Sequence, residues 1–440
     1  MSHTSALNPS IAPLPPLTPQ DEAQSIAFSL LFLCMLLLSL ALKLWLSMRQ
    51  IRHVARHRDQ VPEPFAPSIS LHAHQRAAAY TVARIRLSLL EAMAQAGGLV
   101  VLTMLGGLQG LIVLGALLPE SWDGWRGPIL VLSVLLVSSL IDVPFAWWRQ
   151  FHLEERFGFN RMTRRLFVAD LLRSTLVGLV LGLPLLIAVL AVMGAAGSLW
   201  WIWAWGLWMG FNLFVLWVFP GVVAPLFNRF EPLPEGPVRE RVQGLLKRVG
   251  FAARGLFVMD GSRRSAHGNA YFTGFGKARR IVFFDTLLAQ LDENEIEAVL
   301  AHELGHFKLR HLQRRLLTLS GGSLLGLALL GWLSEQAWFF AGLGTAPDRA
   351  VIDATALVLF MLVAPVFFFL LGPLSHYFSR RDEFAADAFA VQHADRAALI
   401  AALTKLYRDN AAPLSSDPLY SAAHDSHPPA SERIARLSTG

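Results

Sequence analysis

The sequence predicts an α-helical integral membrane protein with a smaller polar domain that contains a β-sheet. Hydrophobic residues make up 54% of the 440 residues, and charged residues make up only 16%. The mean hydropathy of +0.45 is far above that of a typical water-soluble protein of this length. Seven long apolar stretches and one short histidine motif, at residues 302–306, are the other two observations that define this class.

The seven stretches reach or approach the roughly 20 residues that a helix needs to cross the hydrocarbon core. They cover approximately residues 25–47, 97–118, 129–148, 171–196, 199–220, 316–343 and 354–378. The fourth and fifth are joined tightly at 196–198, which predicts a helical hairpin. The first stretch has no basic region before it and no small-residue cleavage site after it, so we expect a retained anchor.

Arginine residues predict the orientation in the membrane, because basic residues are enriched on the cytoplasmic side. They follow the first stretch at Arg49, Arg52, Arg56 and Arg58, and the third at Arg149, Arg156, Arg161, Arg164 and Arg165. The N-terminus is therefore expected outside and the C-terminus inside. Five Lys against 33 Arg, with abundant Ala and Leu, favour a bacterial protein and hence a bacterial inner membrane.

This topology divides the chain into five parts. They are a disordered N-terminal segment (1–24), the first five transmembrane helices with their loops (25–220), a first part of a cytoplasmic domain (221–315), two further transmembrane helices (316–378) and a second part of the domain (379–440). The third stretch also contains Asp142, whose carboxyl group needs a partner or water at that depth. A packing role and a functional role for Asp142 both remain open.

The overall charge does not indicate a nucleic-acid partner. The formal net charge is +6 and the pI is about 9.8, but the arginines cluster beside the apolar stretches, and there is no stacking motif or basic repeat. Membrane lipid is the expected environment. The single cysteine, Cys34, lies within the first stretch, which excludes a disulfide within the chain and a thiolate zinc site.

The motif His302-Glu303-Leu304-Gly305-His306 has the spacing H-E-x-x-H. On a helix, positions i and i+4 lie on one face, so both imidazoles can bind one Zn²⁺ while Glu303 takes a proton from water at the open position. Asp292, with Glu295 three residues later, resembles a capping box and predicts a helix that starts before the motif. Two unrelated core or surface histidines remain the alternative.

A catalytic zinc ion usually has three protein ligands, so a third ligand is expected. Glu383 and Asp387 lie four residues apart on one predicted helical face. Glu383 could bind the metal, while Asp387 accepts the free N–H of a ligand histidine. From spacing alone, a solvated acidic face balanced by Arg380 and Arg381 is equally favoured.

Two further segments could complete such a site. His427 precedes a rigid Pro-Pro turn and Arg433 follows six residues later, and both could stabilise an oxyanion, although an ordinary tail is the simpler reading. Residues 269–275 and 280–284 predict a hairpin. Its edge strand, with Asn269 and Ala270, could bind an extended peptide by strand addition, or the hairpin could merely pack on the motif helix.

Several motifs together resemble the integral-membrane CAAX prenyl proteases of type 1, which are zinc endopeptidases. The resemblance rests on residues 152–160 (HLEERFGFN), 224–234 (APLFNRFEPLP), 417–429 (DPLYSAAHDSHPP) and the segments described above. These motifs occur in consistent order over about 280 residues. They are therefore much more specific than H-E-x-x-H alone.

The resemblance implies seven transmembrane helices that form a chamber, closed on the cytoplasmic side by a zincin-like metallopeptidase domain. It implies one Zn²⁺ bound by His302, His306 and Glu383, with Asp387 supporting a ligand. The implied catalytic residues are Glu303 as general base, His427 at the oxyanion and Arg433 as electrostatic support. Asn269 and Ala270 would line the substrate strand.

The sequence departs from the family pattern at Gly268, where the family commonly has Ser, and at Asp382 and Ala385, where it commonly has an aromatic residue and Gln. None of these changes removes an expected ligand. We expect a zinc metalloendopeptidase that cleaves a peptide or protein, including a lipidated one, near the cytoplasmic membrane face. The alternatives are a quality-control metalloprotease without prenyl dependence, and a zinc-stabilised scaffold or lipid-binding chamber without proteolysis.

Overall fold

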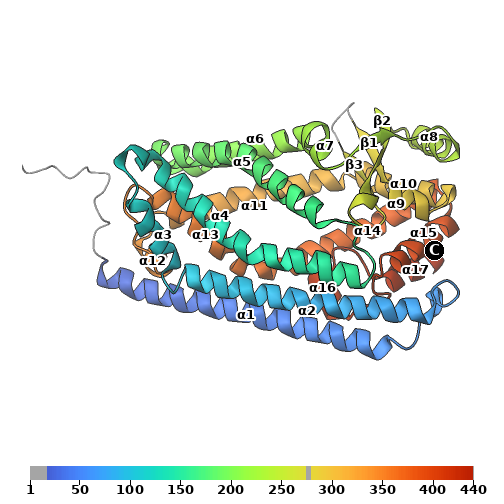
Figure 1. The fold of residues 1–440 in the computed structure, drawn as a ribbon, viewed down its shortest axis with the longest axis horizontal. Helices are drawn as coiled ribbons and strands as arrows, with labels where there is room; N and C mark the ends of the chain where they lie inside the picture. The colour runs from blue at the N-terminus through green and yellow to red at the C-terminus, as the bar shows by residue number, and fades with distance from the viewer. Residues whose placement is uncertain (1–16, 274–278, 440) are drawn as a thin grey trace, which may run out of the picture.

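The computed structural model describes residues 17–273 and 279–439, and within them seven apolar helices are long enough to cross a membrane (Figure 1). They are α1 (Pro19–His57), α2 (Leu71–Leu102), α4 (Asp123–Trp148), α5 (Arg164–Ala195), α6 (Trp200–Val218), α11 (His311–Leu333) and α13 (Ile352–Phe368). Two short helices, α3 (Gly107–Ala116) and α12 (Ala337–Ala341), lie between them in the chain. The predicted fold class is therefore confirmed.

The second transmembrane helix was placed wrongly by the sequence. It covers Leu71–Leu102 instead of residues 97–118, and the remainder of the predicted stretch forms α3. The reason is that α2 carries Arg84, Glu91 and Gln95, which lower its hydropathy. These side chains line a cavity inside the protein, so their polarity does not prevent α2 from spanning.

Other boundaries also differ from the prediction. Helix α1 begins at Pro19 rather than near residue 25, because Thr18 and Asp21 form a capping box in which Thr18 Oγ1 accepts from Asp21 N at 3.1 Å. Residues 1–16 of the predicted disordered segment lie outside the described residues. The sixth span begins at His311 rather than 316 and ends at Leu333, and the seventh begins at Ile352 rather than 354.

The polar domain is built from two separate parts of the chain. The first part contains α7 (Ala224–Phe227), α8 (Pro237–Val249), α9 (Asp285–Gln290) and α10 (Glu293–Lys308). The second contains α14 (Gly372–His393), which follows α13 after a single 3₁₀ turn, α15 (Arg396–Asp409), α16 (Pro418–His424) and α17 (Ala430–Thr439). Both parts meet at one end of the long apolar helices (Figure 1).

The domain contains one four-stranded sheet in the order β1-β2-β4-β3. Its strands are β1 (Phe230–Pro232), β2 (Gly255–Met259), β3 (Ala270–Thr273) and β4 (Arg280–Phe284). Strands β3 and β4 are antiparallel, which confirms the predicted hairpin, although residues 274–278 lie outside the described residues. The parallel pairing of β2 with β4 was not predicted. Strand β3 lies at an edge of the sheet and is free to accept another strand.

Helices α10 and α14 approach each other very closely. A Cβ atom added at Gly305 would lie 3.0 Å from the Cα of Ala386, so a larger residue at position 305 would force the two helices apart. Around this contact lies an apolar core that includes Leu300, Leu304 and Ala402, all without exposed surface. The glycine in the histidine motif therefore brings α14 within reach of the histidines.

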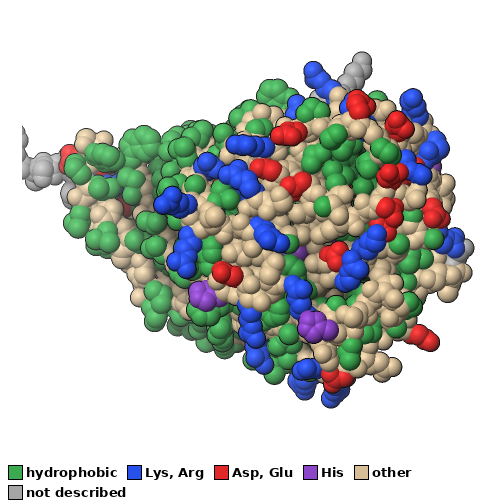
Figure 2. Space-filling model, turned by 45° about the vertical axis from the view of Figure 1, so that its right-hand side comes forward, with side chains coloured by type: hydrophobic (Ala, Val, Ile, Leu, Met, Phe, Trp, Pro, Cys, Tyr) green, Lys and Arg blue, Asp and Glu red, His purple; other side chains and the backbone are tan. Residues whose placement is uncertain are grey.

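The two ends of the molecule differ in surface chemistry. Figure 2 shows charged side chains spread over the broad end that carries the domain, whereas the narrow end is mostly hydrophobic. Arg264 joins the domain to the apolar helices, because it forms an ion pair with Asp170 of α5 at 2.8 Å and donates to Asn228 Oδ1 at 2.8 Å. A cavity of about 700 Å³ lies between α1, α2 and the C-terminal part of the domain, and one of about 580 Å³ lies among the apolar helices α1, α2, α4 and α13; the resemblance implies a chamber in this region.

Candidate metal centre

Helix α10 presents both histidines of the motif on one face. The predicted capping box is present, since the side chain of Asp292 accepts from Glu295 N at 3.0 Å and that of Glu295 accepts from Asp292 N at 2.8 Å. This pair fixes the first turn of the helix. His302 and His306 then lie one turn apart, with their Nε2 atoms 3.2 Å from each other.

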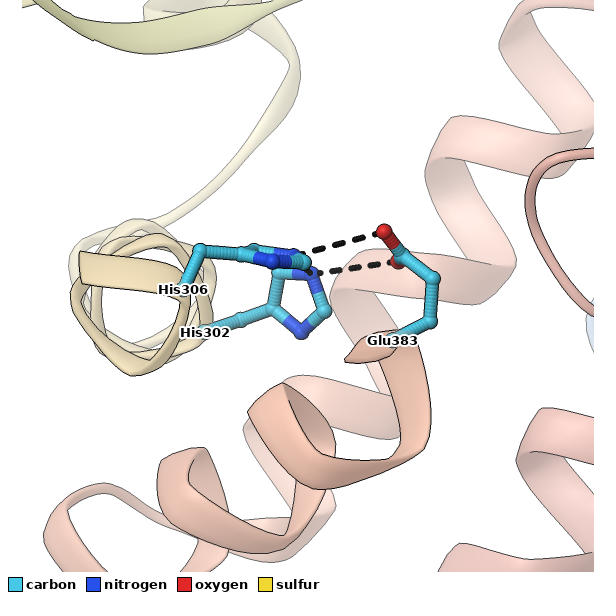
Figure 3. Close-up of side chains that lie close together, drawn as sticks. All are labelled: His302, His306 and Glu383. Carbon is cyan, nitrogen blue, oxygen red and sulfur yellow. Dashed lines mark hydrogen bonds and ion pairs between the residues drawn. The ribbon is translucent and has the colours of Figure 1, made fainter. Parts of the chain in front are cut away.

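Helix α14 brings a carboxylate to the same point (Figure 3). Glu383 Oε2 lies 3.4 Å from His302 Nε2, and Oε1 lies 3.3 Å from His306 Nε2. One ligand atom from each of the three residues falls within 4.8 Å of the others. Two nitrogens and one oxygen are donors that Zn²⁺ accepts, and three protein ligands leave a position open.

The surroundings of Glu383 also fit a cation. Its carboxylate is almost fully buried, and within the described residues the neighbours of its Oε2 atom, His302 Nε2 at 3.4 Å and Arg433 Nη1 at 3.8 Å, are too distant for a good hydrogen bond. A buried carboxylate oxygen without a close polar contact is costly, and a bound divalent ion would reduce that cost. The residues present therefore fit a metal ion.

His302 is supported by a buried charged network. Its Nδ1 atom lies 2.8 Å from Asp387 Oδ1, and Arg433 of α17 donates to both oxygens of Asp387, at 2.8 and 2.5 Å. All three side chains are nearly inaccessible to solvent. Burial alone would lower the pKa of His302, but its bonds to Asp387 and Glu383 outweigh burial and raise the pKa to about 9.

His306 has a different support, which the sequence analysis missed. Its Nδ1 atom lies 2.9 Å from Nδ1 of His311, a buried residue at the start of α11. Behind His311 lies Asp382, whose Oδ1 atom is 3.7 Å from His311 Nε2 and also accepts from Arg314 Nη2 at 2.9 Å. In the sequence, the only indication of this contact is that His311 follows His306 by five positions.

The junction between α10 and α11 explains this contact. On one continuous helix, residues five positions apart point about 140° away from each other. Arg310 breaks the helix, because it has φ 58° and ψ 33°, a left-handed conformation that is uncommon for a residue other than glycine. The break turns His311 back toward His306.

Glu303 lies beside the three converging side chains, in a cavity of about 490 Å³ that His302, His306 and Glu383 also line. Burial raises the pKa of Glu303 above its ordinary value, which suits a group that both accepts and releases a proton near neutral pH. Asn269 lines the same cavity, together with Ala270, Tyr271 and Phe272 of the edge strand β3.

His427 reaches the site from the C-terminal part of the chain. Its Nε2 atom lies 3.4 Å from Glu383 Oε1, and its side chain remains 64% exposed, so it faces open space beside the ligands. The segment before it is held in place by Arg49 of α1, which donates to both oxygens of Asp417 at 3.1 and 2.8 Å. Arg380 donates to the carbonyl of Asp425 at 2.9 Å.

The structure thus brings together every residue that the sequence analysis proposed for the site. Three departures from the family pattern were noted above. A Cβ atom at Gly268 would lie 2.4 Å from Gln290 Oε1 and 3.3 Å from Leu287 Cα, so a side chain there would require Gln290 to move. Asp382 forms the contacts described above. Nothing in the structure explains Ala385.

Comparisons with known proteins show what the chain is similar to. One sequence profile, described as CAAX prenyl protease N-terminal, five membrane helices, matches residues 50–229, and a second, Peptidase family M48, matches residues 232–439. The chain is 33% identical over 422 residues to the CAAX prenyl protease 1 homolog of Oryza sativa subsp. japonica. This alignment covers 92% of this chain and 96% of that protein. It is 32% identical over 351 residues to the CAAX prenyl protease 1 homolog of Homo sapiens, and this alignment covers 71% of this chain and 73% of that protein. The crystal structure of S. mikatae Ste24p superposes with a TM-score of 0.86 at 26% identity, covering 96% of this chain and 100% of that chain.

Proposed function

The chain belongs to peptidase family M48, and from this premise we propose that it is a zinc endopeptidase that cleaves lipidated peptides at the cytoplasmic face of a membrane. Membership makes the chain an integral-membrane metalloprotease, which removes the scaffold alternative. The single observation that carries the proposal is the meeting of His302, His306 and Glu383 in one cavity with Glu303 and an edge strand. Zinc is proposed because its preferred ligands match this set.

In the proposed mechanism, His302, His306 and Glu383 hold one Zn²⁺ ion. Zinc in such a site supplies Lewis acidity, which polarises the peptide carbonyl and acidifies the attacking water. Asp387 fixes the orientation of His302 by accepting from its Nδ1 atom. Arg433 holds Asp387 in place and adds positive charge near the developing oxyanion.

Glu303 is proposed as the proton carrier. It takes a proton from the attacking water and later gives a proton to the leaving amine. His427, with its Nε2 atom directed at Glu383, stabilises the oxyanion from the other side of the cavity. The peptide lies along β3, an edge strand of the sheet, and Asn269 and Ala270 line its path.

The setting of the site supports a substrate that is attached to the membrane. Helix α10 leads directly into α11, and α14 continues from α13, so both ligand-bearing helices are tied to membrane-spanning helices. We propose that the N-terminus lies outside a bacterial inner membrane, and that the two domain parts, 221–315 and 379–440, lie in the cytoplasm. A lipid-anchored peptide would be presented at this edge, and the relatives are named as CAAX prenyl proteases.

The test uses purified full-length protein in detergent, with a farnesylated CAAX peptide and its unprenylated control, each with and without a chelator. We expect chelator-sensitive cleavage that favours the farnesylated peptide. Equal cleavage of both peptides would instead indicate a quality-control protease without prenyl dependence.

The role of Glu303 is tested separately by Glu303→Gln, which keeps the shape of the side chain and removes its basicity. We expect turnover to fall by at least about 1,000-fold, while one zinc ion per chain remains bound by elemental analysis. Turnover close to that of the unmodified protein would show that another group is the base.

A further inference from the structure

Three cavities follow one another from the metal centre into the membrane-spanning helices. The site cavity contains His302 and Glu303 and measures about 490 Å³. The middle cavity, between α1, α2 and the C-terminal segment, measures about 700 Å³ and shares Ser426 and His427 with the site cavity. The deep cavity, which reaches Asp142, measures about 580 Å³ and shares Lys43, Ala92 and Gln95 with the middle cavity.

Two cations line the middle cavity. They are Lys43 of α1 and Arg84 of α2, and within the described residues neither forms an ion pair with a carboxylate. Both cations lie near aromatic rings: Lys43 Nζ is 5.4 Å from the centre of the Phe369 ring, and the Arg84 guanidinium is 5.6 Å from that of Tyr80. A lysine within a membrane-spanning helix is costly to keep and marks a functional site by default.

The acidic residues that could balance these cations are engaged elsewhere. Glu91, which lines the same cavity, forms an ion pair with Arg149. Asp142, in the deep cavity, accepts from Gln95 Nε2 at 3.0 Å. Asp425 also lines the cavity, where burial raises the pKa of its carboxyl and the nearby Arg380 and Arg84 oppose that shift. Since neither Lys43 nor Arg84 forms an ion pair with a carboxylate in the described residues, the middle cavity suits an anion.

The length of the middle cavity is set by the two helices that line it. Lys43, Ser47 and Gln50 lie on one face of α1, and the residues from Arg84 to Gln95 lie along α2. At 1.5 Å per residue, these faces extend over about 10 and 16 Å. An extended peptide of three residues is also about 10 Å long. The cavity can thus hold a short C-terminal tail that enters past His427.

We infer that Lys43 and Arg84 form a binding site for the free α-carboxylate of the peptide substrate, whose last residues lie in the middle cavity. The inference rests on the proposed function, in which the scissile bond lies between Glu303 and His427. A CAAX sequence ends the chain, so its free carboxylate lies three residues beyond the prenylated cysteine. The site thereby selects for a chain terminus over an internal peptide segment.

The test compares one farnesylated peptide as the free acid and as the C-terminal amide. For the unmodified protein we expect the KM of the acid to be at least about tenfold lower than that of the amide, a difference of roughly 1.4 kcal/mol. In Lys43→Met and Arg84→Gln the preference falls toward one, because the KM of the acid rises. Arg86→Gln is the matched control, since Arg86 lies on α2, is exposed and does not line the cavity, and it keeps the full preference.

A binding measurement keeps this test independent of turnover. In Glu303→Gln protein, equilibrium binding of a labelled C-terminal tripeptide should be at least about tenfold tighter for the acid than for the amide, and Lys43→Met should remove the difference. Equal binding of acid and amide would overturn the inference even if cleavage is chelator-sensitive. Loss of the preference on adding vesicles of anionic lipid would also overturn it, because the cations would then hold lipid phosphates. Failure of the proposed function would appear differently, as absent or chelator-insensitive cleavage of both peptides.

Discussion

The two histidines of the motif have very different surroundings, although they lie on adjacent turns of one helix. The side chain of His302 is 9% exposed and contacts Asp387, which Arg433 holds with two hydrogen bonds. The side chain of His306 is 21% exposed and contacts the ring of a second histidine, His311. On the far side of that ring, Asp382 Oδ1 lies 3.7 Å from His311 Nε2. We call these the charged support and the imidazole support.

The supports also differ in where they come from. The charged support comes from α14 and α17, 85 and 131 residues after His302, whereas the imidazole support comes mainly from His311, five residues after His306. The distant residues make the shorter contacts. Because charge-assisted hydrogen bonds are about twice as strong as neutral ones, we expect the charged support to fix its histidine more firmly.

The largest effect is expected from breaking the charged support with Arg433→Met. This change leaves the buried Asp387 carboxylate without its two guanidinium bonds, and breaking a buried pair in this way costs about 3 kcal/mol of stability. We expect metal affinity to fall by about 100-fold, measured by competition with a chromophoric chelator, together with a lower midpoint of thermal unfolding.

Arg436→Met is the matched control for this change. Arg436 lies on the same helix, α17, over the ring of Phe384 at 4.6 Å, and forms no ion pair in the described part of the chain. Metal affinity should remain within about twofold of the unmodified protein. Equal loss in the two variants would mean that Arg433 acts only through the stability of α17.

The pH dependence of metal binding sharpens the comparison further. In the metal-free protein, the raised pKa of His302 contributes stability that is present below its ordinary value of 6.5 and is lost as the pH rises through about 9. Metal binding requires the neutral ring, so affinity should rise about tenfold per pH unit between pH 7 and 8. Chelator competition at several pH values measures this slope, and Asp387→Asn should flatten it because His302 then releases its proton more easily.

The sequence predicted the local parts of this site well and the distant parts only through resemblance. H-E-x-x-H and the capping box are formed by residues within one helix, and their spacing alone fixes their geometry. For Glu383 and Asp387, the spacing fitted a solvated acidic face as well as it fitted a metal site, because spacing does not indicate what a helix packs against. Gly305, which allows α14 to approach within contact of α10, carries no signal of its own.

The fold was predictable where side chains face lipid. Helix α2 was misplaced since its polar face lines the cavities, and hydropathy cannot distinguish such a helix from a loop. His311 was missed for a related reason. Its contact with His306 depends on the left-handed backbone at Arg310, and nothing in the local sequence indicates a break at an arginine.

A smaller effect is expected from His311→Phe, which removes the imidazole support and keeps a similar ring volume. His306 is partly exposed, so water can replace the lost partner at its Nδ1 atom. We expect metal affinity to fall by about tenfold, at the low end for such supporting residues. His393→Phe is the control, because within the described residues the His393 ring has one hydrogen-bond partner, the carbonyl of Phe389 at 2.9 Å, and lies away from the metal centre. A loss as large as that of Arg433→Met would show that the two supports are equivalent.

The smallest effect is expected from Asp382→Asn, at one of the three positions that the sequence analysis described as departures from the family pattern. The 3.7 Å separation from His311 is too long for a strong hydrogen bond, and its other partner, Arg314, is 57% exposed. Exposed pairs contribute little, so metal affinity should change by only about twofold to threefold. Arg314→Gln removes the ion pair alone and should have no effect on the metal if Asp382 acts through His311. A roughly tenfold loss of metal affinity in Asp382→Asn would instead mean that the carboxylate holds His311 firmly. The imidazole support would then depend on a charge, as the charged support of His302 does.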